Sequence, residues 1–239
     1  MHANNDRPGG LRSSLNIEIH SNYAIRLWEG RSSTKDKETG KTIIYAVASM
    51  PYTLWRAGII YQDSMADNPW ADEMMFNIEE LLNKAGKYIQ GQLETVEKIL
   101  KSIPPGITFS DHKSSSPLNI GVYCSSPLGY RCVWVLVGYD QMALKAFQAY
   151  QYGLISRLQR DQLLRQCAHR IRKVYAAIRP YRTVKANRDD LVKQTPAAQE
   201  AIQKMGTPDS GILTGSKRSS FSPPLRRSHH PIVPDDEVS

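Results

Sequence analysis

The chain has 239 residues, of which 41% are apolar, and its formal net charge is +8. This length and apolar share allow one large domain or two small ones with a real core, and they exclude a wholly disordered chain. No stretch approaches the roughly 18 uninterrupted apolar residues of a transmembrane helix, and the first ten residues lack the apolar core of a signal peptide.

The three cysteines of the chain indicate its cellular compartment. Cys124, Cys132 and Cys167 are odd in number and stand in apolar contexts. Such cysteines are typical of buried thiols in a reducing compartment and not of a disulfide framework. We therefore expect a cytoplasmic protein without a membrane partner.

The N-terminal elements are short. We expect residues 1–12 to be flexible. Residues 15–20 alternate between apolar and polar side chains, which predicts a half-buried strand. Ser21 can cap a short helix over residues 23–28, and Gly30 can end it.

The next segment is predicted to change from loop to helix. Residues 31–41 are small and polar, which indicates an exposed and mobile loop. A helix is predicted from about residue 42 to residue 65. Pro51 should kink or break this helix after Met50, because proline cannot donate the helical hydrogen bond.

A long helix should follow. Asp67 or Asn68 before Pro69 is a strong helix start, and Pro104-Pro105-Gly106 should stop the helix. Its apolar stripe could serve a coiled-coil partner, but charges do not flank it in regular pairs, which favours burial within its own domain. The stripe consists of Met74, Ile78, Leu81, Leu82, Ala85, Ile89, Val96, Ile99, Leu100 and Ile103.

The middle of the chain is predicted to be strand-rich. Residues 107–110 and 118–124 resemble short strands. The run over residues 132–137 is β-branched and aromatic, and Gly138 ends it, so it predicts a central strand within residues 130–137. Asp140 is then the expected N-cap of a helix over residues 142–152.

A turn and a long basic helix come next. Gly153 can close the preceding helix, and Ser156 can cap the following one. One stripe of that helix is apolar at steps of three and four, as a core-facing helix requires. The stripe consists of Leu163, Leu164, Cys167, Ile171, Val174, Tyr175 and Ile178.

The C-terminal part is predicted to be less regular. A last helix over residues 187–205 should be divided by Pro196. The Gly-, Ser- and Pro-rich residues 206–224 should be extended. Residues 225–239 should form a disordered tail.

The positive charge of the chain is local. Residues 145–190 hold eleven lysines and arginines against three aspartates, and this excess of +8 equals the net charge of the whole chain. A basic helix with few carboxylates to neutralise it is typical of a protein that binds a polyanion. The alternative interpretation is a solvated helix face, because basic runs are common on soluble proteins.

Catalytic and metal-binding motifs are absent from the sequence. There is no Gly-rich phosphate loop, no Gly-x-Ser-x-Gly elbow and no Cys-x-x-Cys. His112 and His169 have no clustered partner, and His229 and His230 are adjacent in the predicted tail. We therefore expect no enzyme activity, no cofactor, no metal and no small-molecule substrate.

Several short pieces together resemble a known family. The expected order of strand, helix, Gly153 turn and helix looks like a ribbon-helix-helix DNA-binding motif. Over about residues 15–225 the chain resembles the AcaB family of conjugative plasmids and integrating conjugative elements. The matching pieces are RLWEGR at 26–31, DNPWAD at 67–72 with IE at 78–79, PPG at 104–106, SPLGY at 126–130, GL at 153–154, YR at 181–182, RDDL at 188–191, and Gly206, Ile212, Leu213, Gly215, Pro223 and Pro224.

This resemblance implies a fold and a function. The implied fold is α+β and mostly helical, with a single DNA-binding domain over residues 13–224, a ribbon-helix-helix-like core at about residues 130–182 and an additional long helix. The implied function is that of a homodimeric, sequence-specific regulator that binds double-stranded DNA, acts with the nucleoid or a plasmid, and activates conjugative transfer genes.

Two strands could form the DNA-reading ribbon. The central strand over residues 130–137 has one polar side chain, Arg131, which could bond guanine O6 and N7. The strand over residues 15–20 could instead direct Asn16, Glu18 and His20 outward. We favour the central strand, because the cationic helix follows it directly and phosphate contacts supply much of the affinity.

The phosphate contacts are expected on and around the basic helix. Ser156, Arg157 and Arg160 would hold phosphates at its N-terminus, where helix-end amides favour anions. The remaining predicted DNA contacts are Lys145, Arg165, Arg170, Arg172 and Lys173.

Two further functions fit the sequence. A non-catalytic accessory protein of the transfer machinery would use the long helix for protein contacts and bind nucleic acid weakly. An RNA-binding protein is the other alternative, but the basic segment lacks the exposed interleaved aromatic residues that stack unpaired bases.

Overall fold

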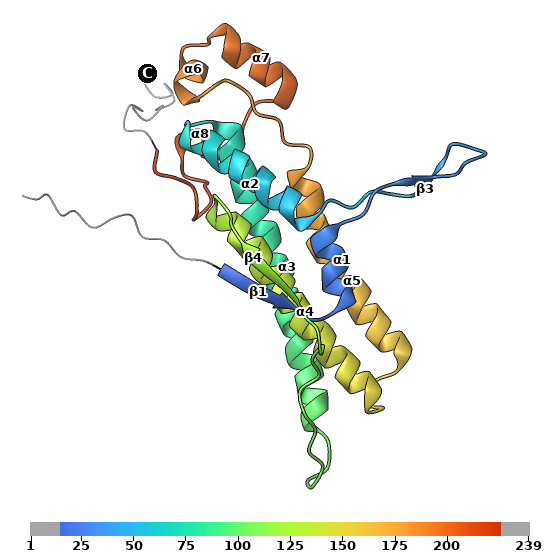
Figure 1. Ribbon diagram of the computed structural model, residues 1–239. Coiled ribbons are helices and arrows are strands. Elements are labelled where there is room, and N and C mark those ends of the chain that lie inside the picture. Colours follow the sequence, from blue (N-terminus) through green and yellow to red (C-terminus); the bar gives the residue numbers. More distant parts are fainter. Residues whose placement is uncertain (1–14, 226–239) are drawn as a thin grey trace, which may run out of the picture.

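The computed structural model describes residues 15–225 of the chain (Figure 1). The predictions for residues 1–12 and for the tail from residue 226 onward lie outside the described residues. The elements, in chain order, are β1 (Leu15–Ile19), α1 (Asn22–Glu29), β2 (Thr34–Lys35), β3 (Thr42–Ile44), α2 (Met50–Met65), α3 (Pro69–Lys101), β4 (Leu118–Val122), α4 (Pro127–Gln151), α5 (Arg157–Ile178), α6 (Arg188–Val192), α7 (Pro196–Met205) and α8 (Ser210–Thr214).

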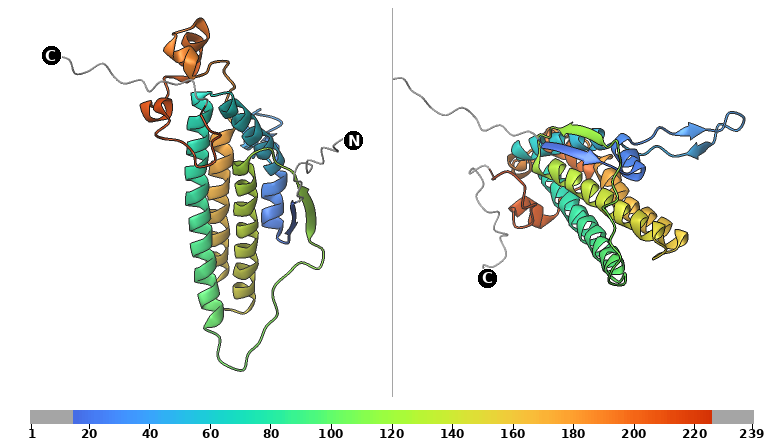
Figure 2. Two further views of the ribbon diagram at one scale, coloured as in Figure 1. Left: turned by 90° about the vertical axis from the view of Figure 1, so that its left-hand side faces the viewer. Right: turned by 60° about the horizontal axis from the view of Figure 1, so that its bottom comes forward.

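Three long helices form the body of the molecule. α3, α4 and α5 run side by side, with α1 and α2 packed against them (Figure 2). The side chain of Asn68 caps the 33-residue α3, and Pro69 stands in its first turn, as predicted. The apolar stripe of α3 is buried within the chain's own core, as Ile78 and Leu100 show. At its start, Met75 is buried in place of the predicted Met74. This burial confirms the preference for packing within the domain.

The predicted central strand is wrong, because residues 130–137 lie inside α4. The Ser126 hydroxyl accepts a hydrogen bond from the Gly129 N–H, and Pro127 stands in the first turn, so helix-start signals precede the β-branched run. Its buried residues recur at helical spacing, as in Leu128, Cys132 and Leu136. Burial between neighbouring helices therefore outweighs the β propensity of the run.

Asp140 is not a helix N-cap. It lies fully buried in the middle of α4, where its carboxylate oxygens accept hydrogen bonds from the backbone N–H groups of His20 (2.9 Å) and Ser21 (2.8 Å). A buried carboxylate needs such partners. Asp140 thus fastens the link between β1 and α1 to the central helix.

The small sheet that covers α4 confirms two of the predicted strands. β1 pairs with β4 in antiparallel register, Leu15 opposite Val122 and Ile19 opposite Leu118. Ile17 and Ile19 point into the core, while Asn16 and Glu18 are exposed, as the alternation predicts. The strand predicted over residues 107–110 is wrong, because this segment pairs with no strand among residues 15–225.

The segment between α1 and α2 is a β-hairpin. β2 and β3 pair antiparallel and extend away from the body of the molecule (Figure 1). Residues 42–44 are therefore strand, and the helix predicted from residue 42 begins only at Met50, with the Ser49 hydroxyl as N-cap. Pro51 stands in the first turn of this helix and does not kink it, because N–H groups in the first turn have no acceptor within the helix and a missing one costs no helical hydrogen bond.

The C-terminal segment confirms one prediction and corrects another. The last helix is divided into α6 and α7, with Pro196 in the first turn of α7. Residues 210–214 form the short helix α8, where an extended chain was predicted, and α8 lies against α3. Across residues 15–225, no helix combines the length and hydropathy needed to cross a bilayer.

Candidate nucleic-acid interface

The basic helix α5 is capped and buried as its sequence predicts. The Ser156 hydroxyl accepts from the Gln159 N–H, and the Gln159 side chain accepts from the Ser156 N–H, so the two residues form a capping box. Gly153 takes the left-handed conformation, with φ 72°. Leu164, Cys167 and Ile171 are among its buried residues, which leaves the opposite face to solvent.

A concave surface runs along one side of α5, between that helix, α1 and the base of the hairpin. It consists of two adjoining hollows of about 480 and 550 Å³, which share Val47 and Arg172. Among the described residues, no carboxylate lines either hollow. We call this surface the basic groove, and its cationic residues are Arg26, Arg31, Arg165, Arg172, Arg179 and Arg182.

Helical geometry explains why three of these arginines line up. Arg165, Arg172 and Arg179 are seven residues apart, close to two turns of helix, so they lie on one side of α5 at steps of about 10 Å. Arg26 comes from α1, and Arg31 begins the hairpin. The groove thus needs three segments that are far apart in sequence.

The arginines of the groove keep their charge available. Within residues 15–225, none of the six is in an ion pair with a carboxylate. Arg31 Nε donates to the Tyr45 carbonyl (3.0 Å) and Arg165 Nε to the Asp161 carbonyl (3.2 Å), contacts that orient the side chains without neutralising them. Asp161 itself is paired with Arg160 and Arg157.

Six of the nine predicted DNA contacts are open or partly open to solvent on α5. Arg165 and Arg172 belong to the basic groove, whereas Ser156, Arg157 and Lys173 lie outside it and are exposed. Arg170 leans toward α3, with its guanidinium carbon 4.7 Å from the centre of the Tyr88 ring.

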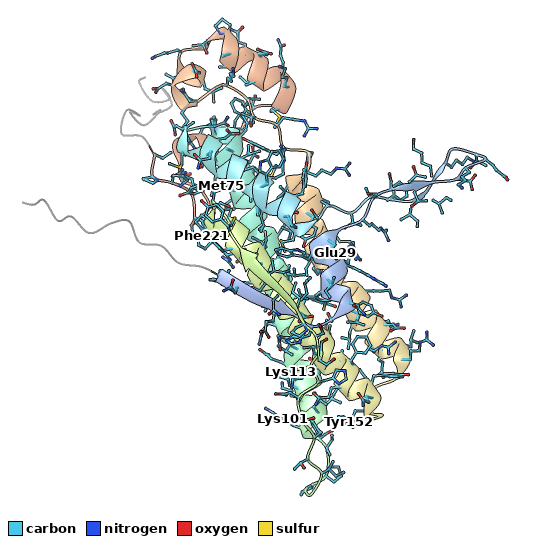
Figure 3. All side chains as sticks on the ribbon, in the orientation of Figure 1. Glu29, Met75, Lys101, Lys113, Tyr152 and Phe221 are labelled. Atoms are coloured by element: carbon cyan, nitrogen blue, oxygen red, sulfur yellow. The ribbon has the colours of Figure 1, made fainter. Side chains whose placement is uncertain are left out.

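The side chains of the other three predicted contacts interact with other residues of the same chain. Arg131 donates to Asn83 Oδ1 (2.8 Å) and lies 5.1 Å from the centre of the Phe221 ring, the residue labelled in Figure 3. Lys145 pairs with Asp111 at 2.9 Å. Arg160 pairs with Asp161 and packs on the rings of Phe147 and Tyr150.

Arg26 and Arg31 were not among the residues predicted to bind DNA. Both lie outside the charge-rich residues 145–190, and Glu29 stands between them, so no local excess of charge marks them. The RLWEGR piece at 26–31 marks the right segment without indicating that its arginines face α5. Only the packing of α1 beside α5 brings them together.

Two of the buried thiols, Cys132 and Cys167, are not activated as nucleophiles. All three cysteines are free and buried, as predicted. Burial raises the pKa of Cys132 and that of Cys167 to about 12, so both are neutral thiols near pH 7. Among the described residues, no group of three or more His, Cys, Asp or Glu side chains is placed to hold a metal ion.

A buried ionic cluster fixes the C-terminal segment to the start of α3. Arg188 donates to Asp67 Oδ1 (2.7 Å), Asp72 Oδ2 (2.6 Å) and the Ile212 carbonyl (2.7 Å). Arg218 adds two hydrogen bonds to Asp72, both at 3.0 Å. This cluster does not reach the groove, and its role is structural.

Comparisons with known proteins identify the family. A family model described as transcriptional regulator AcaB matches residues 7–226, whereas a search of curated proteins finds no match. Among solved structures, the crystal structure of selenomethionine-containing AcaB from uropathogenic E. coli is similar, with a TM-score of 0.53 and 12% identity over 86% of this chain and 96% of that chain. At this identity the structural likeness concerns the fold alone. The family model covers most of the sequence, and the chain therefore belongs to the AcaB family of transcriptional regulators.

Proposed function

We propose that this protein is a homodimeric, sequence-specific DNA-binding regulator that activates conjugative transfer genes of a mobile element. The basic groove carries this proposal, because it gathers six arginines from three segments and, within residues 15–225, has no carboxylate in its lining. Arginine clusters of this kind neutralise phosphates and release condensed counterions. Membership of a family of transcriptional regulators supports DNA as the polyanion.

The groove would hold the phosphate backbone. Arg165, Arg172 and Arg179 lie in one line along α5, and Arg26 and Arg31 face them from the other side. Phosphate contacts position a protein on the duplex but carry no sequence information. Ser156, Arg157, Arg170 and Lys173 would extend these contacts along the exposed face of α5, and Lys145 and Arg160 would join them only after giving up their present partners.

The hairpin would read the bases. A two-stranded ribbon fits the major groove of B-DNA, and this hairpin extends from the edge of the basic groove with side chains on both of its faces (Figure 3). It offers Lys35, Lys37 and Lys41 as donors, and Tyr45 is 74% exposed. Arg131 remains a proposed base contact, but it would have to leave Asn83 to act as one.

The small sheet would join two copies. β1 and β4 form a two-stranded sheet, so within the described residues each strand has one edge without a ladder partner. Unpaired edges favour pairing with another chain. A two-fold contact between the outer edges of β1 would place two basic grooves on one DNA site with inverted halves.

The accessory-protein alternative loses its main support. It would use the long helix for protein contacts, and the apolar stripe of that helix is occupied, because Ile78, Leu82 and Ile89 are buried in the chain's own core. A DNase footprint across the host element, together with a transfer-gene reporter, tests the regulatory part of the proposal. We expect protected inverted half-sites upstream of genes whose expression falls when this protein is removed.

The groove itself is tested by DNA affinity measured against salt. Arg165→Ala and Arg172→Ala should each weaken binding to cognate and scrambled duplexes alike, and each should lower the salt slope by about 1. Lys98→Ala removes an exposed charge from α3, outside the groove, and should change neither value. Affinity that stayed constant between about 50 and 200 mM salt would contradict phosphate binding by the groove.

A further inference from the structure

One of the two hollows of the basic groove is lined by apolar residues as well as by arginines. We call it the root pocket, because it lies at the root of the hairpin, between α1 and α5. It encloses about 480 Å³. This volume falls in the range of small-molecule sites, roughly 300–1,000 Å³.

The root pocket combines two kinds of lining. Arg26, Arg31, Arg165 and Arg172 supply guanidinium groups. Leu27 and Ala168 belong to the apolar part of the lining, together with Leu164 and Val47. A duplex presents its charged sugar-phosphate backbone to a protein groove, so it would use the arginines and leave the apolar part unused. A ligand that uses both must carry negative charge and an apolar body.

We propose that the root pocket binds a small organic phosphate of the nucleotide class. The planar fork of arginine matches phosphate oxygens in bidentate fashion, and four such groups suit a ligand with more than one phosphate. The flat apolar faces of a base would lie against Leu27, Leu164 and Ala168. In the part of the chain that the structure describes, no carboxylate lines the pocket to compete for the arginines.

The position of the pocket couples this ligand to the hairpin. The backbone groups of Arg31 and Val47 are hydrogen-bonded to each other in both directions (3.0 and 2.9 Å), and both residues line the pocket. Gly30 has φ 71°, and a Cβ there would lie 2.6 Å from the Val47 carbonyl oxygen, so the root is tightly packed. A nucleotide would therefore contact the fixed base of the hairpin.

The regulatory consequence rests on the proposed function. Arg165 and Arg172 belong to the pocket and to the proposed phosphate contacts alike, so a bound nucleotide would neutralise charges that the duplex needs. Nucleotide and DNA would then bind competitively. Binding of the nucleotide alone does not depend on the DNA proposal and can be measured without DNA.

The first measurement is calorimetric titration of the full chain, without DNA, with three probes: ATP, adenosine and inorganic tripolyphosphate. ATP combines both halves of the proposed ligand and should bind at least about tenfold more tightly than either of the others. Tripolyphosphate binding as tightly as ATP would overturn the proposal, because the apolar part would then contribute nothing. The absence of ATP binding would overturn it too.

Variants separate the pocket from general charge. Arg26→Ala should weaken ATP about tenfold, the loss of one charged hydrogen-bonding partner. Ala168→Leu fills the apolar part and should abolish ATP binding. It keeps all four arginines of the pocket, so this variant should still bind a duplex. Lys98→Ala is the matched charge control and should bind ATP as the wild type does. Circular dichroism checks that each variant is folded. If Ala168→Leu is not folded, the effect of Arg26→Ala on ATP binding tests the proposal.

Competition completes the test. ATP should weaken duplex binding by the wild type but not by Ala168→Leu. If ATP binds the wild type and all three variants equally, the pocket is not the site and the proposal is wrong. If ATP binds as expected but no duplex does, the pocket stands and the proposed DNA function fails. If a duplex binds but ATP does not, the DNA function stands and the nucleotide site is overturned.

Discussion

Asp72 shows how single residues hold the C-terminal segment in place. Its side chain is fully buried and accepts hydrogen bonds from Arg218, Ser64 and Arg188. Burial alone would raise the pKa of this carboxyl group, but the hydrogen bonds from Arg218, Ser64 and Arg188 outweigh it and bring the pKa below its ordinary value. The ionised form is therefore the one that stabilises the fold.

We expect Asp72→Asn to destabilise the protein by roughly 3–5 kcal/mol near neutral pH, because it takes the carboxylate partner from the largely buried Arg218 and leaves the buried Arg188 with Asp67 alone. Urea unfolding of the full chain measures this difference. Asp111→Asn is the matched control, since its pair with Lys145 lies at the surface and its loss should change the free energy of unfolding far less.

The wild type and Asp72→Asn should also differ in how their free energies of unfolding depend on pH. The folded pKa of Asp72 is depressed, so its contribution is present above the unfolded value, near 3.8, and is lost as the pH falls through the folded pKa. The stability gap between wild type and Asp72→Asn should thus narrow in acid. A gap that widened as the pH fell would contradict this assignment.

At the scale of elements, α4 shows the limit of local propensity. Val133, Trp134, Val135 and Val137 favour a strand, yet they form part of a 25-residue helix. A short apolar run cannot distinguish a buried helix from a buried strand by periodicity alone. The helix start at Ser126-Pro127, six residues before the run, was the stronger signal.

The hairpin is the element whose removal should separate specificity from affinity. Replacing residues 34–44 with a short Gly-Ser turn should leave the helical body folded, because the exposed hairpin contributes no residue to the core. Competition between cognate and scrambled duplexes should then show a specificity ratio near one with much of the non-specific affinity retained, because the arginines of the groove remain.

Arg131→Ala serves as the comparison for the hairpin variant. Its side chain is engaged with Asn83 and Phe221, so its loss should lower the specificity ratio far less than the loss of the hairpin does. If Arg131→Ala collapsed the ratio while the hairpin variant kept it, the reading head would lie on α4 and not on the hairpin.

At the scale of the whole molecule, the proposed dimer is the feature to test. Light scattering at micromolar concentration should give twice the mass of the 27.0 kDa chain, because the edges of the β1–β4 sheet would be paired between two copies. A monomer that bound DNA with full affinity would show that the sheet edge plays no part in recognition.

The sequence by itself determined the strongly periodic and well-capped parts of this protein. The start of α3 at Asn68-Pro69, the Gly153 turn, the capped basic helix α5 and the strand β1 could all be predicted, because local hydrogen bonds and amphipathic spacing specify them. The family could be recognised from short pieces spread along the chain.

Only the tertiary structure decided how those parts pack together and which surface they form. It buries the β-branched run of α4 as helix and engages Arg131, Lys145 and Arg160 within the chain. It also brings Arg26 and Arg31 beside Arg165 and Arg172, more than a hundred residues away in sequence. Spacing along a chain reveals one face of one helix, whereas a groove between helices depends on how they pack, and long-range contacts alone determine that.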